Sequence, residues 1–134
     1  MPGAILCTAP GRAGIIGNPT DMYGGSVVSC STQERAAVVI EPAPCLCFEV
    51  AGQVHEVSCT EDLALDGGYF DVAKAVIDFL NLARARFSLR WACSVPFAAG
   101  LSSSAAMIVA ILNAILAYQG RSYNIYYRAE MARH

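Results

Sequence analysis

Pro96-Phe97-Ala98-Ala99-Gly100-Leu101-Ser102-Ser103-Ser104-Ala105-Ala106 decides the fold, because this stretch joins a strand pattern to a helix pattern. Upstream, from Phe87 to Val95, apolar residues alternate with others at the period of a half-buried strand. Downstream, Ala105 to Tyr118 predicts an apolar helix. Gly100 permits close backbone approach, and three serines bring hydroxyls and free N–H groups to the helix N-terminus. The stretch therefore predicts a cradle for an anion such as phosphate.

Other interpretations of the serine loop remain open at this point. A capped helix with small residues chosen for tight packing explains the same letters. The P-loop signature Gly-Lys-Ser/Thr is absent, and so is the hydrolase signature Gly-x-Ser-x-Gly. Only His55 and His134 are available for a serine-hydrolase triad, which gives it little support. Phosphate and magnesium suit three consecutive serines better.

Composition excludes some partners and favours others. The 134 residues are 55% hydrophobic and 15% charged, with mean hydropathy +0.43 and net charge −2. Scattered basic residues in a slightly acidic chain argue against nucleic acid as a partner. The apolar run Ala105 to Ala117 is shorter than a membrane span and contains Asn113, so no membrane partner is expected. The high apolar share favours surface that faces another domain or a second copy through self-association.

Cysteine usage indicates a reducing compartment. The chain has six cysteines, and no signal peptide pattern precedes them. Cys45 and Cys47 form the only close pair, and no further ligands at zinc spacing accompany them. We therefore expect reduced thiols and a cytoplasmic protein.

The remaining chain predicts strands followed by alternating helices and strands. Strands are expected at 4–8 and 12–16, flanking a turn or irregular corner at Ala9-Pro10-Gly11. Further strands are expected at 26–31, 36–41, 46–50 and 54–59. A helix is expected from Phe70 to about Arg84. A last helix is expected from Tyr123 to His134, with Ser122 as its cap.

A second polar segment runs from Arg12 to Gly25, where a short apolar strand enters a glycine-rich loop. Asp21 can accept hydrogen bonds from sugar hydroxyls, Asn18 can donate and accept, and Arg12 can offset a phosphate or carboxylate charge. The alternative is a turn in which Asn18 and Asp21 bond their own backbone.

Together the two segments resemble one family, the GHMP small-molecule kinases named for galactokinase, homoserine kinase, mevalonate kinase and phosphomevalonate kinase. The resemblance rests on Ala9-Pro10-Gly11-Arg12 with Ile16-Gly17-Asn18-Pro19-Thr20-Asp21, and on Pro96 with Gly100-Leu101-Ser102-Ser103-Ser104-Ala105. It implies an α+β fold like domain 2 of ribosomal protein S5, with a mainly antiparallel sheet and helices packed on one side.

The same resemblance implies roles for individual residues. ATP phosphates would be bound by the loop Ala99, Gly100, Leu101, Ser102, Ser103, Ser104 and Ala105, with Ser104 ligating Mg2+. Arg12 would lie near the transferred phosphoryl group. Asn18, Asp21 and Tyr23 would hold the small-molecule substrate, and Tyr69 would meet the adenine. Asn18-Pro19 stands where sugar-kinase members often carry Glu-His, and the following Tyr23-Gly24 looks like the glucuronokinase branch.

The expectation is thus an ATP-dependent kinase of a sugar or sugar acid. We expect residues 1–134 to be the N-terminal, ATP-phosphate-binding domain, ending before that domain is complete. The family's general-base aspartate and its C-terminal kinase domain are not in the chain, which alone is expected to be inactive. Glu130 is expected to pair with Arg133 or Arg128 within its helix. The alternatives are a non-catalytic nucleotide- or anion-binding module and a mevalonate- or homoserine-type kinase.

Overall fold

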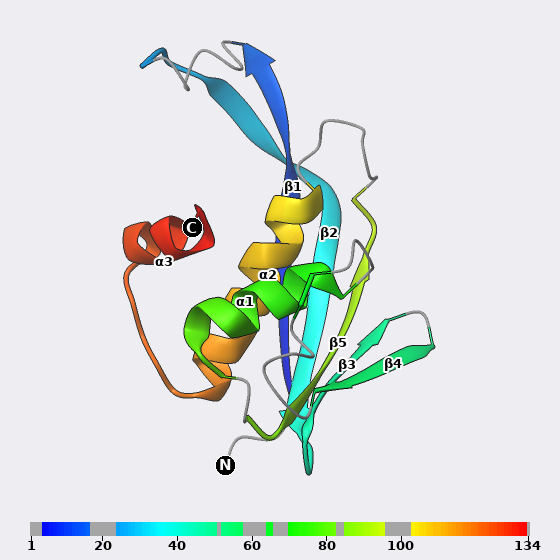
Figure 1. Cartoon of the computed structure of the whole chain (residues 1–134). Helices are drawn as coiled ribbons and strands as arrows, with labels where there is room; N and C mark the ends of the chain where they lie inside the picture. Colours follow the sequence, from blue (N-terminus) through cyan, green and yellow to red (C-terminus); the bar gives the residue numbers. More distant parts are fainter. Residues whose placement is uncertain are drawn as a thin grey trace.

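The computed structural model describes residues 4–16, 24–50, 52–57, 64–65, 70–82, 85–95 and 103–133. Its elements follow the chain in the order drawn in Figure 1: β1 (Ile5–Ile16), β2 (Val28–Pro42), β3 (Leu46–Val50), β4 (Gln53–Val57), α1 (Asp71–Leu80), β5 (Phe87–Cys93), α2 (Ser103–Tyr118) and α3 (Ile125–Arg133). None of these described helices is long and apolar enough to span a bilayer.

The strands form one mixed sheet in the order β1-β2-β5-β3-β4. β3 runs parallel to β5, and the other neighbouring strands are antiparallel. α1 and α2 cover one face of this sheet, and α3 lies beside α2. The α+β fold with a mainly antiparallel sheet and helices on one side is confirmed.

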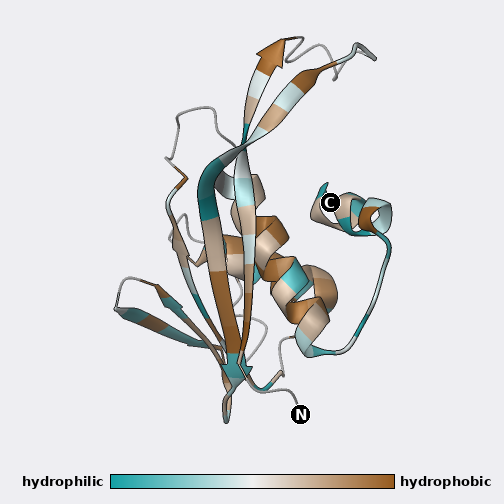
Figure 2. Ribbon diagram, turned by 180° about the vertical axis from the view of Figure 1, so that it is seen from behind, coloured by the Kyte–Doolittle hydropathy of each residue, from teal (hydrophilic) through white to brown (hydrophobic). Residues whose placement is uncertain are grey.

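The core lies between the sheet and α2. Val38, Ile40 and Leu89 on the sheet are fully buried, as are Ile111 and Ile115 on α2. α2 is hydrophobic along most of its length (Figure 2), because the sheet, α1 and α3 surround it. Burial of this helix, rather than an amphipathic surface position, therefore explains the apolar run in the sequence.

Of the two alternatives expected at Ala9-Pro10-Gly11, the turn is wrong, because β1 passes through these residues as one strand. The chain is irregular there, since the β1/β2 register shifts between Pro10 and Arg12. Pro10 pairs with Arg35 and Arg12 pairs with Ser31, so β2 contains two more residues than β1 across this step. The resulting bulge and the edge position of β1 tolerate a proline that has no N–H to donate. β2 likewise runs as one long strand, where the sequence predicts separate strands at 26–31 and 36–41.

Two helix ends also differ from the sequence prediction. α1 stops at Leu80 because Asn81 takes the left-handed conformation, with φ 62°, and Leu82 N–H donates to Ile77 O at 3.0 Å. α3 begins at Ile125, where the side chain of Asn124, not Ser122, accepts a hydrogen bond from Tyr127 N–H at 2.8 Å.

Candidate functional site

A groove of about 430 Å³ lies between β1 and the first two turns of α2. Its walls come from both predicted motifs and consist of Ala9, Pro10, Arg12, Ala105, Ala106 and Val109. Arg12 and Ala105 therefore meet at one site, although one belongs to the first strand and the other to the second helix.

Local backbone features place Arg12 at the groove. The bulge separates Pro10 and Arg12 in the β1/β2 register, and the Arg12 side chain is exposed beyond it. Ala9 is buried beneath, at 4% exposure, where its methyl group joins the core. The small side chains of Ala105 and Ala106 leave room above the helix that a larger residue would fill.

The electrostatics of the groove favour an anion. α2 has no acidic residue in its first turn, so the partial positive charge of its N-terminus is not offset there. Ser104 is exposed in that turn and immediately precedes the groove-lining Ala105. The cationic Arg12 stands on the opposite wall. A phosphate group matches the combination of a guanidinium, a hydroxyl and free backbone N–H groups.

The structure describes some of the predicted site residues and not others. It describes Arg12, Ser104 and Ala105, together with the backbone of Ser103 as the first residue of α2. The other predicted positions lie outside the described residues: Asn18, Asp21, Tyr23, Tyr69, Ala99, Gly100, Leu101 and Ser102. Their roles stay predictions.

Three groove residues lie outside the stretches to which the sequence assigns a binding role, namely Ala9, Pro10 and Val109. The place of Ala9 and Pro10 in a bulged strand depends on β2. Val109 follows Ala105 on α2, one helical turn beyond it. That i, i+4 spacing is the signal that could have identified Val109.

The described residues supply no cluster of three or more His, Cys, Asp or Glu side chains suited to a metal ion. The groove lining described above contains no carboxylate. The Ser104 hydroxyl fits a magnesium ion that arrives with a phosphate, since Mg2+ in nucleotide sites usually keeps several waters and phosphate ligands. It does not by itself make a dedicated metal cage.

Glu130 is engaged by Arg133 within α3. The Arg133 Nε atom donates to Glu130 Oε2 at 3.2 Å, and Arg133 Nη2 bonds the other carboxylate oxygen. This bidentate i, i+3 pair confirms the predicted intrahelical partner and raises the pKa of Arg133.

Comparison of the sequence with family models gives two matches that follow the two motifs. The model described as the GHMP kinases N-terminal domain matches residues 63–134, which include the serine loop. The galactokinase galactose-binding signature matches residues 2–42, which include Arg12, Asn18 and Asp21. A comparison with curated proteins gave no match.

Solved structures share the fold across almost the whole chain. Mevalonate kinase from Methanococcus jannaschii superposes with TM-score 0.81 at 15% identity, over 97% of this chain and 45% of that protein. Galactokinase from Lactococcus lactis, complexed with galactose, gives 0.78 at 22% identity, over 96% and 36%. Phosphomevalonate kinase from Streptococcus pneumoniae, in complex with phosphomevalonate and AMPPNP, gives 0.74 at 14% identity, over 96% and 41%. The chain spans less than half the length of each.

Proposed function

The chain belongs to the GHMP kinase family, and on that premise we propose that it forms the phosphate-binding part of an ATP-dependent kinase acting on a sugar or sugar acid. The observation that carries the proposal is the groove in which Arg12 meets the N-terminus of α2. One nucleotide-bound relative supports ATP as the phosphoryl donor, because the Streptococcus pneumoniae enzyme holds AMPPNP.

In this mechanism the chain's residues act by positioning and charge. Phosphoryl transfer requires alignment of donor and acceptor and stabilisation of negative charge more than covalent chemistry. The N-terminus of α2 would hold ATP phosphates, and Arg12 would offset charge on the transferred group. Mg2+, when bound through Ser104 and the phosphates, would neutralise further charge. Deprotonation of the acceptor hydroxyl is not assigned to the described groove residues.

The acceptor class rests on the first motif. The galactose-binding signature over residues 2–42 supports a sugar-like acceptor, with Asn18, Asp21 and Tyr23 as its proposed hydrogen-bonding partners. We propose a sugar or sugar acid rather than galactose itself, because Asn18-Pro19 departs from the usual sugar-kinase residues. Hydrogen-bonded polar groups discriminate strongly between substrates, so this segment is where acceptor choice would be made.

We also propose that the far ends of β1 and β2 pack against a second kinase domain in the full-length protein. These ends extend beyond the helices (Figure 1) and expose the apolar side chains of Ile15, Ile16 and Val28. Apolar surface of this kind indicates a contact. Sedimentation of the isolated chain over a range of concentrations tests the alternative occupant, a second copy, since self-association through these residues would contradict the second-domain proposal.

The deciding experiment is calorimetric titration of the 134-residue chain with magnesium ATP, using wild type, Ser104→Ala and Ser122→Ala. Ser122 is also an exposed serine, but it lies in the loop before α3. We expect saturable binding that Ser104→Ala weakens several-fold and Ser122→Ala leaves unchanged. Equal affinity in all three proteins would contradict the proposed role of Ser104 in ATP binding. Absence of binding by a folded sample would contradict the proposal that this chain binds ATP.

Acceptor assays then use the full-length protein with glucuronate, galactose and mevalonate, each followed by ADP release. Phosphorylation of glucuronate or galactose supports the sugar class. Turnover with mevalonate alone would contradict it while leaving the kinase class intact.

A further inference from the structure

The groove beside Arg12 is cationic at one end and hydrocarbon elsewhere. Arg12 and the N-terminus of α2 supply its positive charge. Val109 is the largest side chain that α2 contributes to the groove, and it lies one helical turn, about 6 Å, beyond Ala105. A carbon stem that follows a bound phosphate along α2 therefore meets Val109. The apolar residues of the lining are Ala9, Pro10, Ala105, Ala106 and Val109.

Val109 faces the side of α2 on which the acceptor motif lies. The groove is bounded by β1, and the galactose-binding signature matched at residues 2–42 includes that strand. The neighbouring Ile108 instead lines a cavity of about 160 Å³ that it shares with Phe79 of α1. Both Val109 and Ile108 are partly buried. They form a matched pair of branched side chains, of which Val109 borders the groove.

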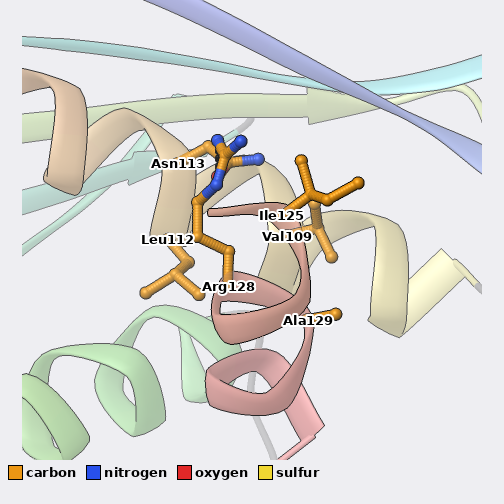
Figure 3. A pocket seen from close by; sticks show the side chains of 6 residues that line it. All are labelled: Val109, Leu112, Asn113, Ile125, Arg128 and Ala129. Atoms are coloured by element: carbon orange, nitrogen blue, oxygen red, sulfur yellow. Dashed lines mark hydrogen bonds between the residues drawn. The ribbon is translucent and has the colours of Figure 1, made fainter. Parts of the chain in front are cut away.

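Val109 also stands between the groove and a second space. A cavity of about 230 Å³ lies between α2 and α3, and Val109 and Ile125 belong to its lining. On its other side, Arg128 Nη1 donates to Asn113 Oδ1 at 3.1 Å. Figure 3 shows Val109 and Ile125 together, away from this hydrogen bond. Because Val109 lines both spaces, shortening its side chain would open the groove toward the cavity.

From this arrangement we propose that Val109 is a specificity-determining residue that limits the size of the acceptor. The inference rests on the proposed phosphate site, and it adds a limit on the carbon stem bonded to the phosphate oxygen. Phosphorylation of a hydroxyl forms a phosphate monoester, so monoesters of different stem length measure this limit. A stem of about four carbons gains from burial against Ala106 and Val109, whereas a longer stem is stopped by the Val109 side chain.

The test titrates the ¹⁵N-labelled chain with methyl, butyl and hexyl phosphate, which share one headgroup and differ in stem length. Shifts of the Ala105 and Ala106 amide signals report binding at the groove. We expect butyl phosphate to bind about tenfold more tightly than methyl phosphate, because it buries more hydrocarbon. Hexyl phosphate should bind no more tightly than butyl phosphate.

Two substitutions at Val109 should move the limit in opposite directions. Val109→Ala opens the groove toward the cavity, and we expect it to bind hexyl phosphate about tenfold more tightly than wild type does. Val109→Phe fills the groove, and we expect its affinity for butyl phosphate to fall to that for methyl phosphate. Neither variant should change the affinity for methyl phosphate.

The matched controls are Ile108→Ala and Ile108→Phe, which alter the α1 side of the same helix turn and should leave all three affinities unchanged. Amide spectra of each variant establish that it is folded. Val109→Ala decides the question if Val109→Phe does not fold.

The outcomes separate this inference from the phosphate site on which it rests. If methyl phosphate binds and Arg12→Ala weakens it, the phosphate site stands. An equal dependence on stem length in wild type and folded Val109 variants would then overturn the role of Val109. The same shift in the Ile108 variants would also overturn it, because it would show a general loosening of α2. Failure of all three phosphates to bind the folded wild-type chain would contradict the phosphate site and this inference together.

Discussion

Arg12 on β1 and Ala105 on α2 face the same groove of about 430 Å³, although one residue lies near the start of the chain and the other follows five strands and one helix. The fold brings them together because α2 packs across β1 and β2. A guanidinium and a helix N-terminus thus act on one volume, and each favours negative charge in it.

Replacing Arg12 should weaken binding of magnesium ATP without unfolding the protein. Arg12 is exposed, so Arg12→Ala removes charge and hydrogen bonds from the groove but little packing. We expect the dissociation constant to rise about tenfold, the scale of one lost charge-assisted hydrogen bond. Arg12→Lys should recover part of the affinity. Arg121→Ala, an exposed arginine in the loop before α3, is the matched control. Equal losses in Arg12→Ala and Arg121→Ala would point to a non-specific charge effect.

Lys74 is a buried cation whose removal should destabilise the fold. It is 3% exposed, its Nζ donates to Ala64 O at 3.2 Å, and it lies 3.8 Å from the Asp71 carboxylate. Lys74→Met keeps most of the side-chain volume but leaves both acceptors without this donor. We expect a loss of about 1–3 kcal/mol in the free energy of unfolding, measured in urea.

Asp78→Asn provides the comparison for Lys74, because Asp78 lies on the same helix with an exposed side chain. Its effect should stay within about 0.5 kcal/mol. Lys74→Met as stable as wild type would mean that the hydrogen bond and the ion pair contribute no net stability.

The sequence predicts elements well where the signal is local. The range 46–50 expected for β3 is the observed range, and the Glu130 pair with Arg133 follows from helix spacing. The turn at Pro10 fails because the extra residues that accommodate it belong to the partner strand, which no window around Pro10 contains. The end of α1 depends on Asn81, a residue that tolerates positive φ less often than glycine does.

In the candidate site, as in the fold, the features with a local sequence signal could be predicted and those that depend on packing could not. The serine loop and Arg12 could be predicted as anion-binding because each motif carries its own chemistry. That they form one groove depends on the packing of α2 on β1. The Arg128 and Asn113 pair could not be predicted, since α3 has no residue that is fully buried and so gives no periodic signal to orient it.

Asn124 should control the local stability of α3. Its side-chain oxygen accepts the Tyr127 N–H, and α3 contributes no fully buried residue to hold it by packing. Asn124→Ala should therefore cost about 1 kcal/mol, mostly as local opening. Hydrogen exchange at amides of α3 measures this loss. Ser122→Ala, the cap predicted from sequence, should leave exchange unchanged. Faster exchange in Ser122→Ala than in Asn124→Ala would reverse the assignment of the cap.

Thiol titration should make the protein less stable at alkaline pH. Burial raises the pKa of Cys7, and burial together with Cys45 and nearby glutamates raises the pKa of Cys47. Below the unfolded-state pKa, both states hold the thiol proton, so these groups contribute no pH dependence. Above it, the unfolded chain releases protons that the folded chain keeps, and the free energy of unfolding falls as pH rises.

Urea midpoints should accordingly decrease from about pH 8 upward, near the ordinary range of a cysteine pKa. Cys7→Ala with Cys47→Ala should flatten that decrease, whereas Cys30→Ala, which alters an exposed thiol, should not. The same pair should react slowly with a disulfide reagent at pH 8, because a retained proton lowers the thiolate fraction and burial restricts access. A midpoint that is constant to pH 10, or an equal slope in the double variant, would show that other groups control alkaline stability.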